Sequence, residues 1–316
     1  MSTFELVPLP GDRAKAATAI TRIWNAASRA LTQSDTLAIS TRLADFNLQP
    51  GHGQRIEGRF AQAANGEVVG YVVAGAQEAL GWVDSLAVQP RAQGRGVGGA
   101  LLAWAEGWLH ANGAGVARIG GGLRPWLPGY PRALGGESWF LSRGYAPAGT
   151  VWDVATDLEA MVAYPSRASA DLIARPATPG DVGALRDFFI REFPGRWRYE
   201  FEEHVREGGR MSDYIILLEA GRVEAFCLTT REDSLRPIDR FYLNGLPRPW
   251  GQAGPLGTAA GARGKGYAAR VINAALADLH AAGVRGCIID WTDLVDFYAR
   301  FGFRPWRAFL PLRKAL

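Results

Sequence analysis

The feature that most constrains the fold is an internal repeat. The stretch Gln93-Gly-Arg-Gly-Val-Gly98 precedes an Ala/Leu-rich segment that ends at His110-Ala-Asn-Gly113. The stretch Arg263-Gly-Lys-Gly-Tyr-Ala268 precedes a similar segment that ends at His280-Ala-Ala-Gly283. Positions 93 and 263 are 170 residues apart, as are positions 110 and 280. A repeat that conserves order and spacing predicts two copies of one domain, each of ordinary size within the 316 residues.

Both copies contain the same sequence of expected elements. A short strand, a Pro-Gly-Asp turn and an amphipathic helix come first, and a hairpin follows, over residues 55–76 in one copy and 213–229 in the other. A third strand, over residues 82–88 or about 255–258, leads into the glycine-rich stretch and a helix. We therefore expect an α/β (α+β) protein of two domains, 1–160 and 171–316, joined by the polar, proline-bearing segment 164–170. Each domain should have a mixed, mainly antiparallel central sheet flanked by helices.

Composition narrows the class of protein. The net charge is only +4 and the basic residues are scattered, so nucleic acid is not expected as a partner. Apolar runs fall short of the roughly 18 residues that span a bilayer, and the N-terminus does not resemble a leader, so we expect a cytoplasmic protein without a membrane partner. Cys227 and Cys287 lie in apolar runs, which predicts two buried, unpaired thiols, and without a Cys/His cluster we expect no metal site.

The glycine-rich stretch between a strand and a helix is typical of an anion site, because unpaired amides at the helix entrance point toward the ligand. Glycine lets the backbone approach a phosphate closely. A P-loop would end in Gly-Lys-Ser/Thr, and neither copy does. A dinucleotide fingerprint would follow the first strand of a βαβ unit, whereas here the loop follows an antiparallel hairpin and a further strand. A third nucleotide-binding pattern of this kind is that of acetyl-coenzyme A.

The chain resembles the GNAT acyltransferase superfamily at these loops. The signature Gln/Arg-x-x-Gly-x-Gly/Ala is matched in both copies, and the first copy also has Leu86-Ala-Val88-x-Pro90 before it. The resemblance implies that backbone amides in both loops bind the pyrophosphate of acetyl-CoA. These loop residues are Gln93, Gly94, Arg95, Gly96, Val97, Gly98, Arg263, Gly264, Lys265, Gly266, Tyr267 and Ala268. Arg95 and Lys265 would add positive charge there.

The same resemblance implies that the strand before each loop diverges from its neighbour. The freed backbone around Leu86 and Val88, and around Leu256 and Thr258, would pair with the amide-like pantetheine arm.

Catalytic residues differ between the copies. Acetyl transfer to an amine needs a base for the amine proton and an acid for the coenzyme A thiolate. The family often uses as the acid a tyrosine in Tyr-x-x-x-Gly-Phe/Tyr; the second copy has Tyr298 there and the first has Phe140. Asp290, at the end of an apolar strand, is a candidate base in the second copy, and Asp84 is one in the first. The position equivalent to Asp84 in the second copy is Gly254.

The expected function is transfer of acetyl from acetyl-CoA to a primary amine, with the second copy catalytic and the first copy, which lacks the tyrosine acid, binding coenzyme or shaping the acceptor cleft. The stretch 289–307 resembles the C-terminal domain of tandem glucosamine/glucosaminide N-acetyltransferases, which implies an amino sugar as acceptor. Aromatic residues that could stack on a sugar, or pack in the core, are Trp126, Trp197, Tyr199, Trp250 and Trp306. Two alternatives stay open, a non-catalytic acyl-CoA sensor and a thiol-conjugate (mycothiol-type) synthase. The expected partner is a small-molecule amine, bound by a monomer or a homodimer.

Overall fold

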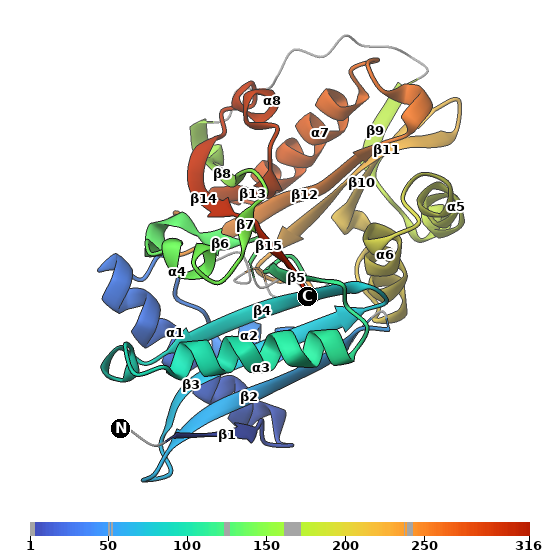
Figure 1. Cartoon of the computed structure of the whole chain (residues 1–316). Helices are drawn as coiled ribbons and strands as arrows, with labels where there is room; N and C mark the ends of the chain where they lie inside the picture. The colour runs from blue at the N-terminus through green and yellow to red at the C-terminus, as the bar shows by residue number, and fades with distance from the viewer. Residues whose placement is uncertain are drawn as a thin grey trace. The chain divides into compact units, whose positions relative to one another are not determined.

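The chain forms two compact units in a computed structural model that describes residues 4–49, 51, 53–122, 127–160, 172–236, 238 and 243–316 (Figure 1). One unit is Met1–Trp152 with Arg307–Leu316, and the other is Asp153–Trp306. The expected ranges, 1–160 and 171–316, differ from these units because residues 153–160 pack with the second unit and residues 307–316 with the first. The expected linker, 164–170, lies outside the described residues.

The first unit begins with a strand and a long helix, followed by a three-stranded meander and the repeat helix. Its elements are β1 (Phe4–Pro8), α1 (Arg13–Thr32), α2 (Thr41–Asn47), β2 (Arg55–Ala63), β3 (Val68–Gln77), β4 (Leu80–Val88), η1 (Pro90–Ala92), α3 (Val97–Ala111), β5 (Val116–Ile119), β6 (Tyr130–Pro131), η2 (Arg132–Leu134), α4 (Ser138–Leu141), β7 (Ala146–Pro147) and, from the end of the chain, β15 (Leu312–Ala315).

A seven-stranded sheet organises the first unit, in the order β1-β2-β3-β4-β5-β15-β7. Only β4 and β5 are parallel among its pairs, because α3 returns the chain between them. Helix α3 lies across one face of β2–β4, with α1 and α2 on the other (Figure 1). The apolar side of α3, made by Val97, Leu101, Ala105 and Leu109, is at most 3% exposed, as the i, i+4 spacing requires.

The second unit repeats this arrangement. Its elements are β8 (Val151–Asp157, which starts in the first unit), η3 (Leu158–Ala160), β9 (Leu172–Pro176), η4 (Pro179–Asp181), α5 (Val182–Glu192), α6 (Arg196–Arg206), η5 (Met211–Asp213), β10 (Tyr214–Glu219), β11 (Arg222–Arg231), β12 (Trp250–Thr258), η7 (Ala260–Ala262), α7 (Tyr267–Ala281), β13 (Gly286–Thr292), α8 (Val295–Ala299) and β14 (Arg304–Leu310, which ends in the first unit).

The sheet of the second unit runs β14-β8-β13-β12-β11-β10-β9, with β12 and β13 parallel and β9 to β12 antiparallel. Its core is aromatic: Phe188, Phe189, Phe201 and Phe226 are fully buried, and Phe189 lies 4.7 Å from Phe226 and 5.0 Å from Phe201 between ring centroids. Mixed sheets flanked by helices confirm the predicted fold class. Among the described residues, no helix is long and apolar enough to cross a membrane.

Candidate active site

The glycine loop of the first unit leaves the entrance of α3 open. Gly94 and Gly96 have φ of +72° and +85°, a conformation that glycine adopts without the cost that a Cβ imposes. Gly96 is the N-cap residue of α3 and provides no side-chain cap for the first-turn amides. A Cβ placed on either glycine would meet no atom within 4 Å. The loop therefore presents backbone amides and a helix N-terminus to open space, an arrangement suited to a phosphate.

Strand β4 diverges from β5 just before the loop. Their parallel pairing runs from Leu80↔Val116 to Val83↔Ile119 and ends there, although β4 continues to Val88. On its other side β4 stays paired with β3 as far as Val88↔Gly70. Leu86 and Val88 thus lie beyond the end of the β4–β5 pairing, where a ligand can reach the strand edge.

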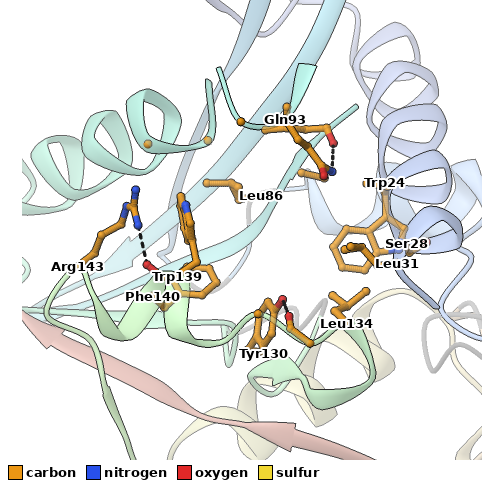
Figure 2. A pocket seen from close by; sticks show the side chains of 18 of the residues that line it. Trp24, Ser28, Leu31, Leu86, Gln93, Tyr130, Leu134, Trp139, Phe140 and Arg143 are labelled. Carbon is orange, nitrogen blue, oxygen red and sulfur yellow. Dashed lines mark hydrogen bonds between the residues drawn. The ribbon is translucent and has the colours of Figure 1, made fainter. Parts of the chain in front are cut away.

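A cavity of about 550 Å³ lies along this strand and loop (Figure 2). Leu86, Val88, Gln93, Gly94, Gly96 and Gly98, all predicted to bind coenzyme, are among its lining residues. The cavity also includes residues of α1, η2 and α4, which face the strand in Figure 2. Its volume falls in the range of roughly 300–1,000 Å³ typical of small-molecule sites.

Two of the predicted loop residues have other local roles, and a third does not line the cavity. The side-chain amide of Gln93 donates to the Val88 carbonyl oxygen at 2.9 Å, and this hydrogen bond holds the loop against β4. The Val97 side chain is 3% exposed and packs in the core of the unit. Arg95 is exposed and is not among the residues that line the cavity.

Asp84 lies on β4 before the loop and is 3% exposed. Its Oδ2 accepts a hydrogen bond from Trp82 Nε1 at 3.0 Å, while its buried Oδ1 has no partner among the described residues. Burial raises the pKa of this carboxyl well above its ordinary value, and the Trp82 hydrogen bond opposes that shift. A Cβ on Gly122 would lie only 2.3 Å from Oδ1, so a glycine is required for this close approach.

A second cavity, of about 50 Å³, adjoins the larger one. It is lined by Asp84 and shares with the larger cavity Trp24, Leu86, Tyr130, Leu134 and Phe140. A buried carboxylate oxygen without a partner is costly unless it serves a function or contacts water. Its position in a small cavity that shares lining residues with the ligand-sized one makes Asp84 a candidate for proton transfer.

Phe140 occupies the position where the second copy has Tyr298. Its ring is buried against Trp139, Tyr130 and Tyr145, with centroids 4.8, 5.3 and 5.6 Å away. The phenol that does line the cavity is Tyr130, which the sequence analysis did not select. Its hydroxyl donates to the Gly135 carbonyl oxygen, and burial, with the nearby Glu137 carboxylate, raises the pKa of Tyr130 to about 12. The only sequence signal for a role of Tyr130 is its position within the stretch Pro128-Gly-Tyr-Pro131.

The glycine loop of the second unit has the same backbone but different neighbours. Gly264 and Gly266 both have φ of +80°, and α7 begins at Tyr267. Here the Glu219 carboxylate lies beside the loop: Tyr267 Oη donates to Oε1, and Lys265 Nζ is 3.7 Å from Oε2. Lys265 and Tyr267 therefore already have an anionic partner within the unit.

Strand β12 also diverges from its parallel neighbour. Its pairing with β13 ends at Gln252↔Ile288, and the following part pairs only with β11, Leu256 with Cys227 and Thr258 with Ala225. The strand is longer than expected because it begins at Trp250 instead of about residue 255. Its first residues, Trp-Gly-Gln-Ala-Gly, do not have the β-branched pattern that predicts a strand.

Tyr298 and Asp290 lie near each other in the second unit. Tyr298, on α8, is 5% exposed, and burial followed by the charges of Cys227 and Asp290 raises the pKa of its phenol. Asp290 Oδ1 accepts a hydrogen bond from Gln252 Nε2 at 3.1 Å, and Gln252 Oε1 accepts one from Thr230 at 3.0 Å. Arg263, Gly264 and Ala268 are the remaining residues predicted to contact coenzyme here, and that role stays a prediction.

The remaining sequence expectations have mixed outcomes. Both cysteines are buried and unpaired, as predicted. Trp197 packs on Phe193, with 4.8 Å between ring centroids, and Trp250 Nε1 donates to the Leu246 carbonyl oxygen, so both belong to packed surroundings. Trp126 lies outside the described residues. Within the described ranges, no group of three or more His, Cys, Asp or Glu side chains is arranged to hold a metal ion.

A comparison with protein families gives a match to part of the first unit. Residues 20–120 match the acetyltransferase (GNAT) family. This match lies within the first unit, and the chain as a whole has a fold similar to that of a tandem GNAT protein. A comparison with curated protein sequences found no match.

Solved structures resemble the chain over nearly its full length. A GCN5-related glucosamine N-acetyltransferase region of a fungal multi-domain GH3 β-N-acetylglucosaminidase is 23% identical with a TM-score of 0.86, covering 99% of this chain and 38% of that one. A GCN5-related N-acetyltransferase from Sphaerobacter thermophilus is 19% identical with a TM-score of 0.70, covering 98% and 95%. A tandem GNAT protein from the clavulanic acid biosynthesis pathway is 15% identical with a TM-score of 0.71, covering 99% and 98%. At these identities the likeness concerns the fold.

Proposed function

We propose that the protein transfers an acetyl group from acetyl-CoA to a primary amine, and that the first unit carries this reaction. The observation that supports it most is the buried Asp84 carboxyl, whose Oδ1 has no partner among the described residues, beside a ligand-sized cavity. The cavity lies along strand β4, which diverges from β5, and along the glycine loop 93–98. A diverging strand and a glycine loop are the two features that acetyl-CoA binding requires.

The residues of the first unit fit the coenzyme. Amides of the loop 93–98 and of the start of α3 would bind the pyrophosphate, because Gly94 and Gly96 leave the space before them free of Cβ atoms. The backbone around Leu86 and Val88 would pair with the amides of the pantetheine arm, since β5 has left this edge of β4. When bound, acetyl-CoA supplies a thioester carbonyl carbon that an amine nitrogen can attack.

Asp84 would act as the base. In the reaction the amine nitrogen forms a bond to the acetyl carbon, the carbon–sulfur bond breaks, and one proton must leave the nitrogen while another reaches the thiolate. Asp84 Oδ1, which has no partner among the described residues, would accept the amine proton, and Trp82 holds Oδ2 by a hydrogen bond that fixes the orientation of the carboxylate. Because the pKa of Asp84 is raised, the carboxylate is a stronger base than an exposed aspartate.

The second unit is the rival location for the chemistry. Tyr298 and Asp290 are close enough for their charges to interact, and β12 diverges from β13 as β4 does from β5. We favour the first unit because the Glu219 carboxylate lies beside the loop of the second, where it would repel a phosphate.

An amino sugar is one candidate acceptor. The likeness in fold to a glucosamine N-acetyltransferase region supports it. The sensor and the thiol-conjugate synthase remain alternative activities for the same fold.

Release of free coenzyme A from acetyl-CoA tests the proposed function. We expect release that depends on a primary amine when alkylamines, arylalkylamines, amino sugars, aminoglycosides and a cysteinyl sugar are each supplied. Coenzyme binding without release in any of these reactions would identify a sensor instead. Release only with the cysteinyl sugar would identify a thiol-conjugate synthase.

A further inference from the structure

One side of the cavity is formed by a face of helix α1. Trp24, Ala27, Ser28 and Leu31 lie on one side of α1 at i, i+3, i+4 and i+7 spacing, and Leu134 of η2 adjoins them in the cavity lining. Figure 2 shows Trp24, Ser28, Leu31 and Leu134 across the cavity from Trp139 and Phe140, with Leu86 between the two sides. We call these five residues the apolar wall.

The apolar wall and the neighbouring Tyr130 have little hydrogen-bonding capacity left. Trp24 Nε1 donates to the Leu37 carbonyl oxygen at 2.7 Å, and the Ser28 hydroxyl to the Asn25 carbonyl oxygen at 3.4 Å. The Tyr130 hydroxyl donates to the Gly135 carbonyl oxygen. These side chains therefore offer a ligand mainly rings and carbon atoms, with the Ser28 and Tyr130 oxygens as the hydroxyl acceptors, and a hydroxyl-rich ligand pressed against them would lose most of its hydrogen bonds to water without replacement.

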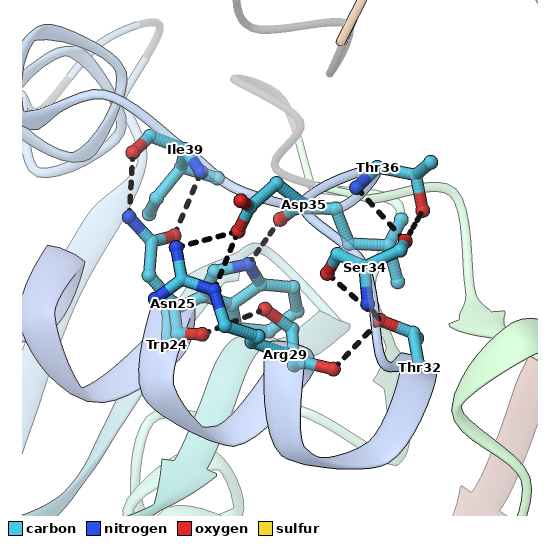
Figure 3. A network of polar contacts seen from close by, with 10 residues as sticks. Trp24, Asn25, Arg29, Thr32, Ser34, Asp35, Thr36 and Ile39 are labelled. Carbon is cyan, nitrogen blue, oxygen red and sulfur yellow. Dashed lines mark hydrogen bonds and ion pairs between the residues drawn. The ribbon is translucent and has the colours of Figure 1, made fainter. Parts of the chain in front are cut away.

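A polar network holds the wall in place (Figure 3). The Asn25 side chain donates to the Ile39 carbonyl oxygen at 3.0 Å and accepts from its amide at 2.8 Å. Arg29 pairs with Asp35, and Thr32 donates to the Ser34 carbonyl oxygen at 3.0 Å. Together with the Trp24 hydrogen bond, these contacts fix the segment after α1 against the helix. The wall is therefore preformed for a ligand and does not have to be ordered when one binds.

Among the described residues, Asp84 is the only acidic group that lines either of the two cavities of this unit. Asp84 lines the smaller cavity together with Trp24, Leu134 and Tyr130. A ligand that reached from the wall to Asp84 would need a positive or proton-donating end and an apolar remainder.

We propose that the acceptor is a primary amine with an aromatic or alkyl body, whose nitrogen lies at Asp84 and whose body packs on the apolar wall. This inference rests on the proposed function and selects among its acceptor classes. It disfavours an amino sugar at the first unit, because a sugar would place several hydroxyl groups against side chains whose donors are already used.

The first test compares three acceptors with acetyl-CoA: 2-phenylethylamine, glucosamine and methylamine, which has the nitrogen without an apolar body. We expect kcat/KM to be highest for 2-phenylethylamine by at least about 10-fold, since a single apolar group in a fitted pocket is worth roughly 10–200-fold. Calorimetric titration of the same amines in the presence of coenzyme A should give the same order of affinity, independently of turnover.

A matched pair of variants tests whether the apolar wall causes the preference for 2-phenylethylamine over methylamine. Leu31 is 49% exposed, so Leu31→Asn should fold, and it should lower kcat/KM for 2-phenylethylamine by about 10-fold through KM, and less for methylamine. Ile190 is also exposed, at 46%, and lies on α5 of the other unit, so Ile190→Asn should leave both values unchanged.

Three results would overturn the inference. Tighter binding and faster acetylation of glucosamine would show that the acceptor is polar. An unchanged selectivity in Leu31→Asn would remove the wall from acceptor binding. Faster transfer to methylamine from hexanoyl-CoA than from acetyl-CoA would assign the wall to the acyl chain of the donor. Failure of every amine to release coenzyme A would instead overturn the proposed function, and this inference with it.

Discussion

Asp84→Asn should lower kcat by about 10²–10⁴-fold, the usual contribution of a general base. Asparagine has nearly the same shape and can still accept the Trp82 hydrogen bond, so the cavity and the affinity for coenzyme A should stay close to those of the wild type. Steady-state rates with 2-phenylethylamine and a calorimetric titration with coenzyme A measure the two effects separately. A rate within a few fold of wild type would remove Asp84 from the chemistry.

The pH dependence of the same variant has a definite sign. A base acts only when deprotonated, so the wild-type kcat/KM should fall as the pH drops through the raised pKa of Asp84. This acidic limb should lie above the ordinary aspartate pKa of about 4. The residual activity of Asp84→Asn should not have it.

Stability should change in the opposite direction to activity. Because burial raises the folded-state pKa of Asp84 above its unfolded value, the favourable contribution of the protonated carboxyl is full below the unfolded pKa and is lost as the pH rises through the folded pKa. Asp84→Asn should therefore raise Tm at neutral pH and have little effect near pH 3. A lower Tm at neutral pH would mean that the charged carboxylate has favourable partners.

Gly96→Val should weaken coenzyme binding in the first unit by about 10-fold or more. Holding a residue with a Cβ in the left-handed region costs roughly 1–2 kcal/mol, which is about 5–30-fold, and a β-branched residue is among the least tolerant of it. The Cβ would also project into the open space before the loop, where phosphate must approach. Titration with coenzyme A gives the affinity and the number of sites.

Gly266→Val is the matched control. Gly266 has φ of +80° against +85° for Gly96, and a Cβ at either position meets nothing within 4 Å, so the two substitutions have equal local costs. If Glu219 keeps the second loop from binding phosphate, Gly266→Val should leave the measured affinity unchanged. Loss of binding in Gly266→Val with normal binding in Gly96→Val would place the coenzyme in the second unit.

The repeat made most of the fold predictable. Helices α3 (Val97–Ala111) and α7 (Tyr267–Ala281) have 15 residues each and follow glycine loops with similar φ values, as the constant spacing of the landmarks predicts. The hairpins were predictable from Asn65-Gly66 and Ala220-Gly221, since turn chemistry is local. The position of β15 in the sheet could not be predicted, because strands pair through backbone groups and the side chains of a strand do not determine which strand it pairs with. Leu312–Ala315 pairs with β5 of the first unit although it ends the chain.

The candidate site was predictable only in part. Asp84 and the glycine loop follow from the order of the elements and from the family motif. The role of Trp24 and Leu31 in lining the cavity could not be predicted from the sequence. A helix face formed by residues 24, 27, 28 and 31 is as typical of core packing as of a ligand site, and only the structure places that face on a cavity. Glu219 was likewise unpredictable, because its contact with Lys265 and Tyr267 joins a hairpin turn to a loop 46 residues further on.

Single-turnover acetyl transfer in Asp84→Asn and Tyr298→Phe, measured side by side, tests the central claim most directly. A single turnover isolates the chemical step from product release, which can otherwise hide the loss of a catalytic group. The account predicts a rate at least about 100-fold below wild type for Asp84→Asn and a rate within about 2-fold of wild type for Tyr298→Phe. The reverse result, with Tyr298→Phe slow and Asp84→Asn normal, would contradict it and place the reaction in the second unit.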